Sequence, residues 1–187
     1  MSDDSQLLAN YARRGDVQSL AALVERHSRG MFAILRGMLP SEADAQDALQ
    51  DAWHRVVRAA GKFRGGEVRA YLAKVARSAA IDLMRRRGRT VSLDAGGEGV
   101  EDEVAEQVAT EPLPSEAFES KADAEEVRLA VQSLPLGPRQ VLLLRMEGEL
   151  TFREIAETLG VPLGTALTWM RLATKNLRKI LVEGEGR

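Results

Sequence analysis

Residues 134–181 contain the feature that most restricts the fold of this chain, a pair of helices with recognisable ends and a short turn between them. Thr151 and Glu154 have the spacing of a capping box, in which Thr151 accepts a hydrogen bond from the Glu154 backbone and the Glu154 carboxylate reaches back to the cap. Gly160 has the conformational freedom to end the helix that begins after Thr151. Pro162 suits the first position of the next helix. The sequence therefore predicts a helix-turn-helix.

The second of these helices has two chemically different faces. One stripe at helical spacing is apolar and is expected to face the core: Ala166, Met170, Ala173 and Leu177. The other carries hydrogen-bond donors suited to the major groove and to phosphates: Thr165, Thr168, Arg171, Lys175 and Arg178. A solvated amphipathic helix on a bundle is the alternative interpretation. The cap, the turn and the second helix together favour DNA binding.

The net charge of −2 conceals three blocks of different sign. Residues 1–90 hold 16 Lys and Arg against 10 Asp and Glu, and residues 127–187 hold 9 against 6. Residues 91–126 between them hold 1 against 12. Two basic helical regions on either side of an acidic segment are typical of two nucleic-acid-binding domains on a linker. A purely solubilising linker would have the same composition.

The pattern of apolar residues, with no strand signal and no internal repeat, predicts an all-α chain of two small helical domains. Four helices are expected in a first domain, at 5–14, 16–37, 42–60 and 67–87. Residues 91–114 read as an acidic flexible linker. Four more helices are expected in the second domain, at 115–133, 138–147, 152–159 and 162–182. The predicted domains are therefore 1–90 and 115–187.

Several classes of function are disfavoured by composition. The chain has no cysteine and only two histidines, His27 and His54, and it has no phosphate-binding glycine loop, so no catalytic site is predicted. Asp51 and His54 have the spacing of a metal-ligand pair, but no second such pair exists for a facing helix, so no metal and no cofactor are predicted. No apolar run approaches the roughly eighteen residues of a membrane span, so a soluble, cytoplasmic protein without membrane insertion is expected.

Residues 44–94 resemble domain 2 of an extracytoplasmic-function sigma factor of bacterial RNA polymerase, and residues 134–181 resemble domain 4 of that family. The matching residues of the first region are Asp44, Asp47, Gln50, Trp53, Phe63-Arg64, Tyr71-Leu72, Ala76-Arg77, Ile81-Asp82 and Arg85-Arg86-Arg87. Those of the second are Leu134-Pro135, Arg139, Glu154-Ile155-Ala156, Leu159-Gly160 and Pro162-Leu163-Gly164-Thr165. The likeness runs from about Gly15 to Leu181.

This resemblance implies a sigma factor that binds core RNA polymerase at its clamp and flap, recognises promoter DNA, melts it and starts transcription. Polymerase-clamp contacts are implied for Asp44, Asp47, Gln50 and Asp51. Binding of the minus-ten element is implied for Arg64, Tyr71, Lys74, Arg77, Ser78, Arg85, Arg86 and Arg87. Binding of the minus-35 element is implied for Arg153, Thr165, Thr168, Arg171, Lys175 and Arg178. A monomer when free, controlled by an anti-sigma factor, is expected.

The sequence departs from the family pattern in two places. Ser78 stands where many relatives have Asn, at a position associated with minus-ten recognition. In the recognition helix, basic residues of the relatives are replaced by apolar Leu167, Trp169 and Leu172. These three form either a protein contact, with an anti-sigma factor or with domain 2, or an extended core under the first helix of domain 4.

Three aromatic or imidazole side chains have interpretations of their own. Trp53 is expected in the core, and His27 is expected to be a partly buried packing residue. Tyr71 suits either stacking on an unpaired base or the core.

For the chain as a whole, the alternative interpretation is a free-standing helix-turn-helix operator-binding regulator, which would dimerise to read paired half-sites. An adaptor that binds polymerase but not DNA is also compatible with the sequence.

Overall fold

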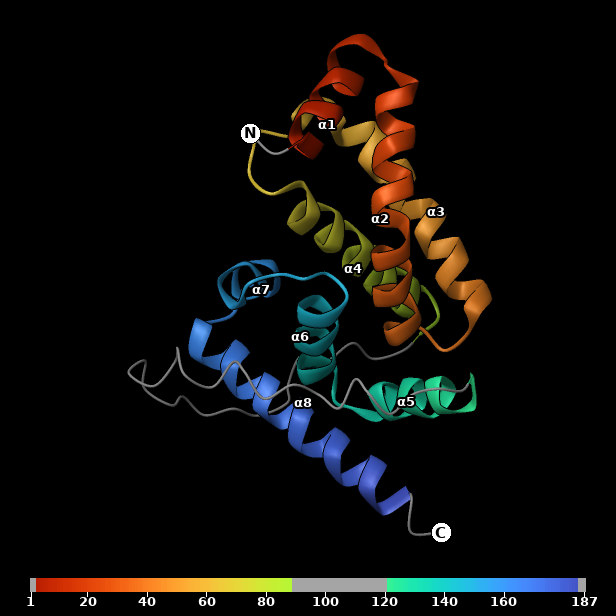
Figure 1. Ribbon diagram of the computed structural model, residues 1–187, viewed down its shortest axis with the longest axis vertical. Coiled ribbons are helices and arrows are strands. Elements are labelled where there is room, and N and C mark those ends of the chain that lie inside the picture. Colours follow the sequence, from red (N-terminus) through yellow and green to blue (C-terminus); the bar gives the residue numbers. More distant parts are fainter. Residues whose placement is uncertain (1–2, 89–120, 185–187) are drawn as a thin grey trace. The chain divides into compact units, whose positions relative to one another are not determined.

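A computed structural model describes residues 3–88 and 121–184 of the chain. The regular structure in these ranges is entirely helical (Figure 1): α1 Asp3–Arg14, α2 Val17–Met38, α3 Glu42–Ala59, the 3-10 helix η1 Ala60–Lys62, α4 Val68–Arg86, α5 Lys121–Ser133, α6 Leu136–Met146, α7 Phe152–Leu159 and α8 Leu163–Gly184. The predicted all-α class is confirmed. The predicted linker, residues 91–114, lies outside the described residues.

The chain divides into two compact units. The first consists of residues 1–91 together with the short segment 146–150, and the second of residues 92–145 and 151–187. Helices α1 to α4 therefore belong to the first unit, and α5 to α8 supply the second.

Two helices of the first unit, α2 and α3, start at side chains that cap them. Asp16 accepts a hydrogen bond from the Gln18 backbone at 3.1 Å and another from the Ser19 hydroxyl at 2.6 Å, which fixes the start of α2. Ser41 accepts from the backbone N–H of Asp44 at 3.1 Å and starts α3. The helix predicted at 42–60 ends at Ala59, one residue early, because the chain tightens into η1.

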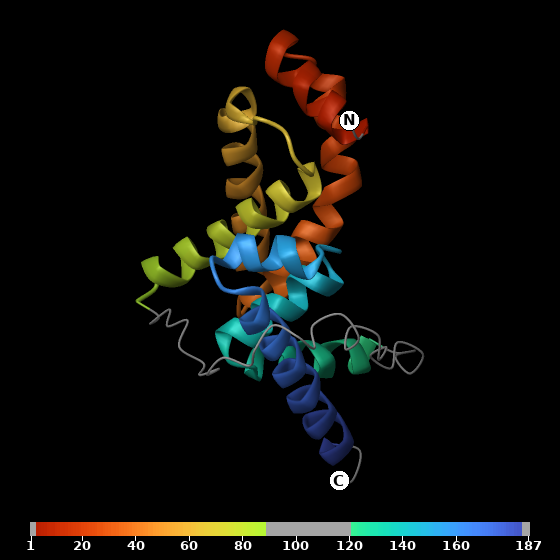
Figure 2. The same ribbon diagram turned by 90° about the vertical axis from the view of Figure 1, so that its left-hand side faces the viewer.

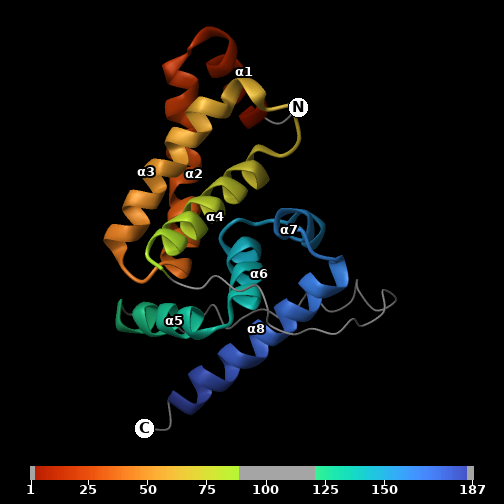
Figure 3. The same cartoon turned by 180° about the vertical axis from the view of Figure 1, so that it is seen from behind.

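The core of the first unit lies where α2, α3 and α4 meet, which Figure 3 shows from behind. Helix α2 contributes large side chains, including Leu23, Ile34 and Leu35, all 1% exposed or less. The inward positions of α3 and α4 are mostly alanine: Ala45, Ala48, Ala52, Ala73, Ala76, Ala79 and Ala80. Small side chains at these positions allow the two helix backbones to approach closely while leucines of α2 fill the remaining space.

The second unit contains the predicted helix-turn-helix. The capping box is present: the Thr151 hydroxyl accepts from the Glu154 backbone at 3.3 Å, and the Glu154 carboxylate accepts from the Thr151 backbone at 2.7 Å. Gly160 has φ +69°, the left-handed conformation that ends α7. Pro162 precedes the helix and is not its first residue, since α8 starts at Leu163. The carbonyl of Pro162 accepts the hydrogen bond from the Ala166 backbone at 3.2 Å.

Helix α6 begins at Leu136, two residues before the predicted start. The Arg139 guanidinium turns back to the end of α5, where its Nη2 donates to the Leu134 carbonyl at 2.7 Å and also to that of Gln132. These bonds hold the connection between α5 and α6. Helix α5 also packs against α8.

Candidate nucleic-acid interface

The outward face of α8 is basic, but its first cation, Arg171, comes only in the third turn of the helix. Helix α8 is the long last helix of the second unit in Figure 2. Its exposed cations are Arg171, Lys175, Arg178 and Lys179, while Thr165 and Thr168 are half-buried. At 100° per residue, these cations and Thr168 share an arc of about 100°. The arrangement suits a helix that follows a groove and its flanking phosphates. Lys179 was missed in the sequence, although it follows Lys175 by one helical turn.

The inward face of α8 differs from the predicted stripe. Ala166, Ala173 and Leu177 are buried as expected, but Met170 is only half-buried. Trp169 is 5% exposed and Leu167 is 8% exposed, so a surface protein contact through these two side chains is contradicted. A Cβ atom at Gly137 of α6 would lie 2.9 Å from three atoms of the indole. Trp169 therefore packs in an extended core, against the α6 backbone and not against the first helix of domain 4, and of the three only Leu172 is half-exposed.

Arg153 is exposed on α7, beside the residues that hold the start of this helix. Its neighbour Phe152 is half-buried, with the Arg145 guanidinium carbon 5.3 Å from the centre of the ring. This cation–π contact joins α6 to α7, the first helix of the helix-turn-helix. Arg153 thus extends from a helix held at its first turn by both a cap and a ring contact.

Helix α4 presents a second basic face. Tyr71, Lys74, Arg77, Ser78 and Arg85 share one side of the helix at helical spacing, and none of them is fully buried. Burial, together with the nearby positive charge of Arg85, lowers the pKa of Arg77. Two guanidinium groups close enough to repel each other are stabilised by an anion such as phosphate. This face therefore has the chemistry that a nucleic-acid backbone requires.

Only part of the predicted polymerase-binding face of α3 is on the surface. Asp44 is 3% exposed, so its predicted role as a surface contact is wrong. Its carboxylate accepts from Arg87 Nη1 at 2.6 Å, and Arg87 Nη2 forms a second contact with it. The Arg87 guanidinium is thus held by a buried carboxylate of α3, while about half of its side chain stays exposed, so its role in minus-ten binding stays a prediction. Asp47 and Gln50 are exposed.

A second ionic link joins α3 to α4 further along. Arg55 donates to Asp51 at 2.6 Å within α3 and to Asp82 of α4, also at 2.6 Å. The hydrogen bonds that Arg55 donates to these two carboxylates raise the pKa of its guanidinium. Arg55 was missed in the sequence, where only its spacing from Asp51 was visible. It fixes the predicted polymerase-binding helix against the predicted DNA-binding helix.

Three more of the residues predicted to bind the minus-ten element, Ser78, Arg86 and Arg64, lie close to polar groups of other residues. The Ser78 hydroxyl accepts from Arg55 Nη1 at 3.4 Å, so it lies at the edge of the same network. Arg86 of α4 lies 3.8 Å from the Asp51 carboxylate and is 66% exposed. Arg64 is exposed, and its guanidinium donates to the Gly61 carbonyl at 3.0 Å.

Tyr71 and Phe63 form an aromatic pair next to the loop between η1 and α4. Their ring centres are 5.2 Å apart and the ring planes are inclined by 50°. Tyr71 is half-buried, and its burial raises the pKa of its phenol. Both interpretations of Tyr71 are therefore partly met, because one side of the ring packs internally and the rest of the side chain reaches solvent.

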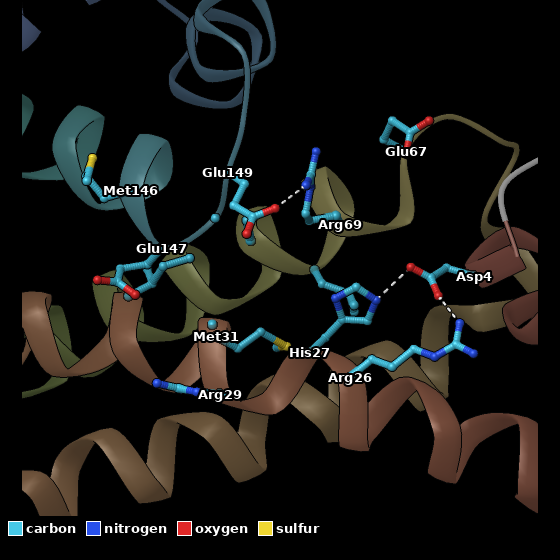
Figure 4. A pocket seen from close by; sticks show the side chains of 15 residues that line it. Asp4, Arg26, His27, Arg29, Met31, Glu67, Arg69, Met146, Glu147 and Glu149 are labelled. Atoms are coloured by element: carbon cyan, nitrogen blue, oxygen red, sulfur yellow. Dashed lines mark hydrogen bonds and ion pairs between the residues drawn. The ribbon is translucent and has the colours of Figure 1, made fainter. Parts of the chain in front are cut away.

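The two histidines and Trp53 also have definite environments. Figure 4 shows His27 pointing toward Asp4, whose carboxylate lies 2.8 Å from His27 Nε2 and also accepts from Arg26 at 2.9 Å. His27 is half-buried, as expected, and its contact joins α1 to α2. His54 is exposed on α3. Trp53 is half-buried, not fully in the core, because its indole donates to the Ser28 hydroxyl at 3.0 Å.

Within residues 3–88 and 121–184, no group of three or more His, Asp or Glu side chains is arranged to hold a metal ion. No helix in that part of the chain is long and apolar enough to cross a membrane.

Comparison with known proteins gives matches in both units. Residues 23–90 match the family model of Sigma-70 region 2, and residues 124–177 match that of Sigma-70, region 4. The chain is 27% identical to the ECF RNA polymerase sigma factor SigE of Mycolicibacterium smegmatis, over 97% of the chain and 70% of that protein. It is also 27% identical to the ECF RNA polymerase sigma factor SigW of Bacillus subtilis, over 90% of the chain and 92% of that protein.

Two solved structures have the same fold. CnrH, in complex with the cytosolic domain of CnrY, matches with a TM-score of 0.71 and 21% identity, over 97% of this chain and 99% of that one. The sigma factor RpoE from Bartonella quintana, in complex with the anti-sigma factor NepR, matches with a TM-score of 0.67 and 21% identity, over 88% of this chain and 97% of that one.

Proposed function

The chain belongs to the extracytoplasmic-function (ECF) sigma factors, and from this premise we propose that it binds core RNA polymerase and directs promoter recognition, DNA melting and transcription initiation. The observation that carries the proposal is the pairing of two family matches, in the family's order, with an outward basic face on α4 and another on α8. The chain would act as a specificity subunit and not as a catalyst.

We assign residues 1–90 to sigma domain 2 and residues 115–187 to sigma domain 4. In domain 2, the exposed part of α3 is the contact with the polymerase clamp, with Asp47 and Gln50 as its principal residues. Asp51 supports that contact indirectly, because its carboxylate is already hydrogen-bonded to Arg55. A carboxylate and an amide on an exposed helix face provide polar groups that a basic partner surface can bind without large desolvation.

The basic face of α4 binds the minus-ten region. Lys74, Arg77 and Arg85 contact phosphates, because their positive charges share a face and are partly exposed. Tyr71 borders that face, where the accessible part of its ring can stack on an unpaired base. Arg86 and Arg64 lie at the periphery of this surface and contribute charge.

The outward face of α8 binds the minus-35 region, with Arg153 of α7 contacting the flanking backbone. Thr165 and Thr168 in the first two turns and Arg171 in the third face base edges, and Lys175 and Arg178 contact phosphates further along. This division follows from helix-turn-helix docking, in which the N-terminal part of the recognition helix enters the major groove.

Control by an anti-sigma factor is part of the proposal. RpoE of Bartonella quintana, which has the same fold, is held by an anti-sigma factor, and an inhibitor of that class is expected for this chain. The free protein is expected to be a monomer in the cytoplasm, because the proposed mechanism needs one copy per polymerase.

Transcription with purified components tests the proposed function. The chain is mixed with core RNA polymerase and a library of promoter DNA, and new transcript starts are mapped by sequencing the RNA. Starts that share two spaced upstream elements support sigma activity. A stable polymerase complex without starts would indicate an adaptor, and no complex would leave the free-standing operator-binding regulator as the better interpretation.

A matched pair of variants tests the polymerase contact. Asp47→Ala combined with Gln50→Ala is expected to weaken binding to core polymerase at least tenfold, whereas Glu25→Ala, which removes an exposed carboxylate from α2, leaves it unchanged. Circular dichroism checks that both variants are folded. Equal binding by the two variants would contradict the assignment of α3 to the clamp.

A further inference from the structure

One carboxylate of the first unit is close to both of the surfaces that the proposed function assigns to that unit. Asp51 lies one helical turn after Asp47, on the helix assigned to the polymerase clamp, and its side chain is 41% exposed. The same carboxylate lies 3.8 Å from Nη2 of Arg86, an arginine of α4 that is 66% exposed. The charge of Asp51 is therefore shared with the DNA-binding helix and is still reachable from solvent.

The charges around Asp51 form a group of two carboxylates and two guanidinium groups. Arg55 donates to Asp51 from Nε at 3.0 Å and from Nη2 at 2.6 Å, and it donates to Asp82 from Nη1 at 2.6 Å. All contacts to Asp51, including that of Arg86, reach its Oδ2 atom. Within residues 3–88 and 121–184, no side chain donates to Oδ1. This second oxygen is the acceptor that a further cation would use.

Asp82 lies within the basic face of α4. It follows Ser78 by four residues, which turns it by about 40° around the helix, and its side chain is 38% exposed. An unneutralised carboxylate at this place would repel DNA phosphates. Arg55 reaches from α3 and cancels that charge, and its Nη1 also donates to the Ser78 hydroxyl at 3.4 Å. The charge of the DNA-binding face therefore depends on a side chain of α3.

We propose that Asp51 couples polymerase binding to DNA binding, because a cation of the clamp that approaches Asp51 replaces Arg86 and frees that guanidinium for a DNA phosphate. The bond from Arg55 to Asp82 stays in place, so Asp82 remains neutralised. The coupling is reciprocal, since DNA that captures Arg86 leaves Asp51 more available to the clamp. Asp51 is a positioning residue, because it acts on DNA only through Arg86. This inference rests on the proposed function of α3 and α4.

The size of the effect follows from the exposure of the pair. Ion pairs between exposed side chains change an equilibrium by up to about fivefold. A released arginine also adds one phosphate contact, which steepens the dependence of log affinity on log salt concentration by about 0.9 for duplex DNA. A merely structural role of Asp51 would lower affinity and would not steepen the salt dependence.

DNA binding by the free full-length chain tests the coupling. Asp51→Asn imitates a neutralised carboxylate and keeps its shape, and fluorescence anisotropy at several salt concentrations measures the affinity for a labelled duplex. The matched control Glu25→Gln removes one exposed carboxylate from α2, so the net charge changes by the same amount. Both substitutions are also made in an Arg86→Ala background. Thermal melting checks that every variant is folded.

Asp51→Asn is expected to bind about three- to fivefold more tightly than wild type and to steepen the salt dependence by about 0.9. Glu25→Gln changes the affinity by less than about 1.5-fold, because its charge is screened from the DNA-binding face. In the Arg86→Ala background, Asp51→Asn no longer strengthens binding, since the guanidinium that it would release is absent.

The same comparison in the holoenzyme tests whether the clamp does what the substitution imitates. With core polymerase at saturating concentration, the wild-type Asp51 is already engaged. The gain from Asp51→Asn is then expected to fall below about twofold. A gain as large as in the free chain would overturn the coupling.

An equal gain with Glu25→Gln would overturn the inference, because the gain would then come from net charge alone. A gain that persists without Arg86, or the absence of any gain with Asp51→Asn, would overturn it as well. The proposed function fails separately, when the wild-type chain forms no complex with core polymerase or starts no transcript.

Discussion

The buried pair of Asp44 and Arg87 is expected to respond very differently to removal of its two partners. The side chain of Asp44 is 4% exposed, whereas that of Arg87 is 51% exposed. Arg87→Met leaves a carboxylate that water hardly reaches and that has lost its counter-charge. Removal of one partner of a fully buried pair costs about 3–5 kcal/mol. Because Arg87 is half in water, we expect a loss of about 2–4 kcal/mol in the free energy of unfolding of the first unit.

The reverse replacement is expected to cost less. Asp44→Asn keeps the shape of the side chain, and the half-exposed Arg87 can turn to water. The loss is then about 1–2 kcal/mol, made up of one charge-assisted hydrogen bond and a favourable charge at the start of α3. In the double variant the buried charge no longer exists. Arg87→Met with Asp44→Asn is therefore expected to be more stable than Arg87→Met alone.

Urea unfolding followed by tryptophan fluorescence measures these differences. Trp53 belongs to the first unit, and replacement of Trp169 by phenylalanine in all variants leaves Trp53 as the only indole. Equal losses for the two single variants would refute the reasoning, since they would mean that Asp44 is as well solvated as Arg87. A double variant less stable than Arg87→Met would also refute it.

Three further predictions concern local contacts. Gly137→Ala should destabilise the second unit by about 1–3 kcal/mol through overpacking and shift Trp169 emission to longer wavelength, measured with the other tryptophan replaced; unchanged emission would contradict the close contact. Thr151→Ala should cost the second unit about 1 kcal/mol in thermal melting while Thr151→Ser costs much less, because only serine keeps the capping hydroxyl toward Glu154. Burial opposes ionisation of Asp4, but hydrogen bonds from Arg26 and His27 outweigh it and lower the pKa of Asp4 below 3.8. The contribution of Asp4 to α1 docking should therefore be complete above about pH 4 and disappear as the pH falls through the lowered value; an Asp4→Asn variant with the same acid unfolding profile as wild type would contradict this.

Much of the local structure follows from short-range rules. The capping box at Thr151, the left-handed Gly160 and the helix 152–159 were predicted correctly, because the residues that decide them lie within one or two turns of each other. The ends of other helices moved by one or more residues, as at Pro162 and Leu136, where the neighbouring chain decides which backbone groups find partners.

The candidate site was predicted less completely than the helices that carry it. Helical spacing placed Arg171, Lys175 and Arg178 correctly on the exposed face of α8, since positions on one helix have fixed angles to each other, but Lys179 was missed. It did not show that Trp169 packs on Gly137, because those residues are on different helices. The same limit explains why Met170 was placed in the core and is only half-buried.

The ion pairs between helices could not be predicted from the sequence for the same reason. Asp44 and Arg87 are 43 positions apart, and Arg55 and Asp82 are 27 apart. Nothing in the spacing of either helix indicates which carboxylate meets which guanidinium.

The sequence by itself determined the helices, their caps, the family and the two basic regions, because these depend on neighbouring residues and on residue types. Only the tertiary structure decided which charges face outward and which neutralise each other, because that depends on how each helix is rotated against its neighbours in the packed core.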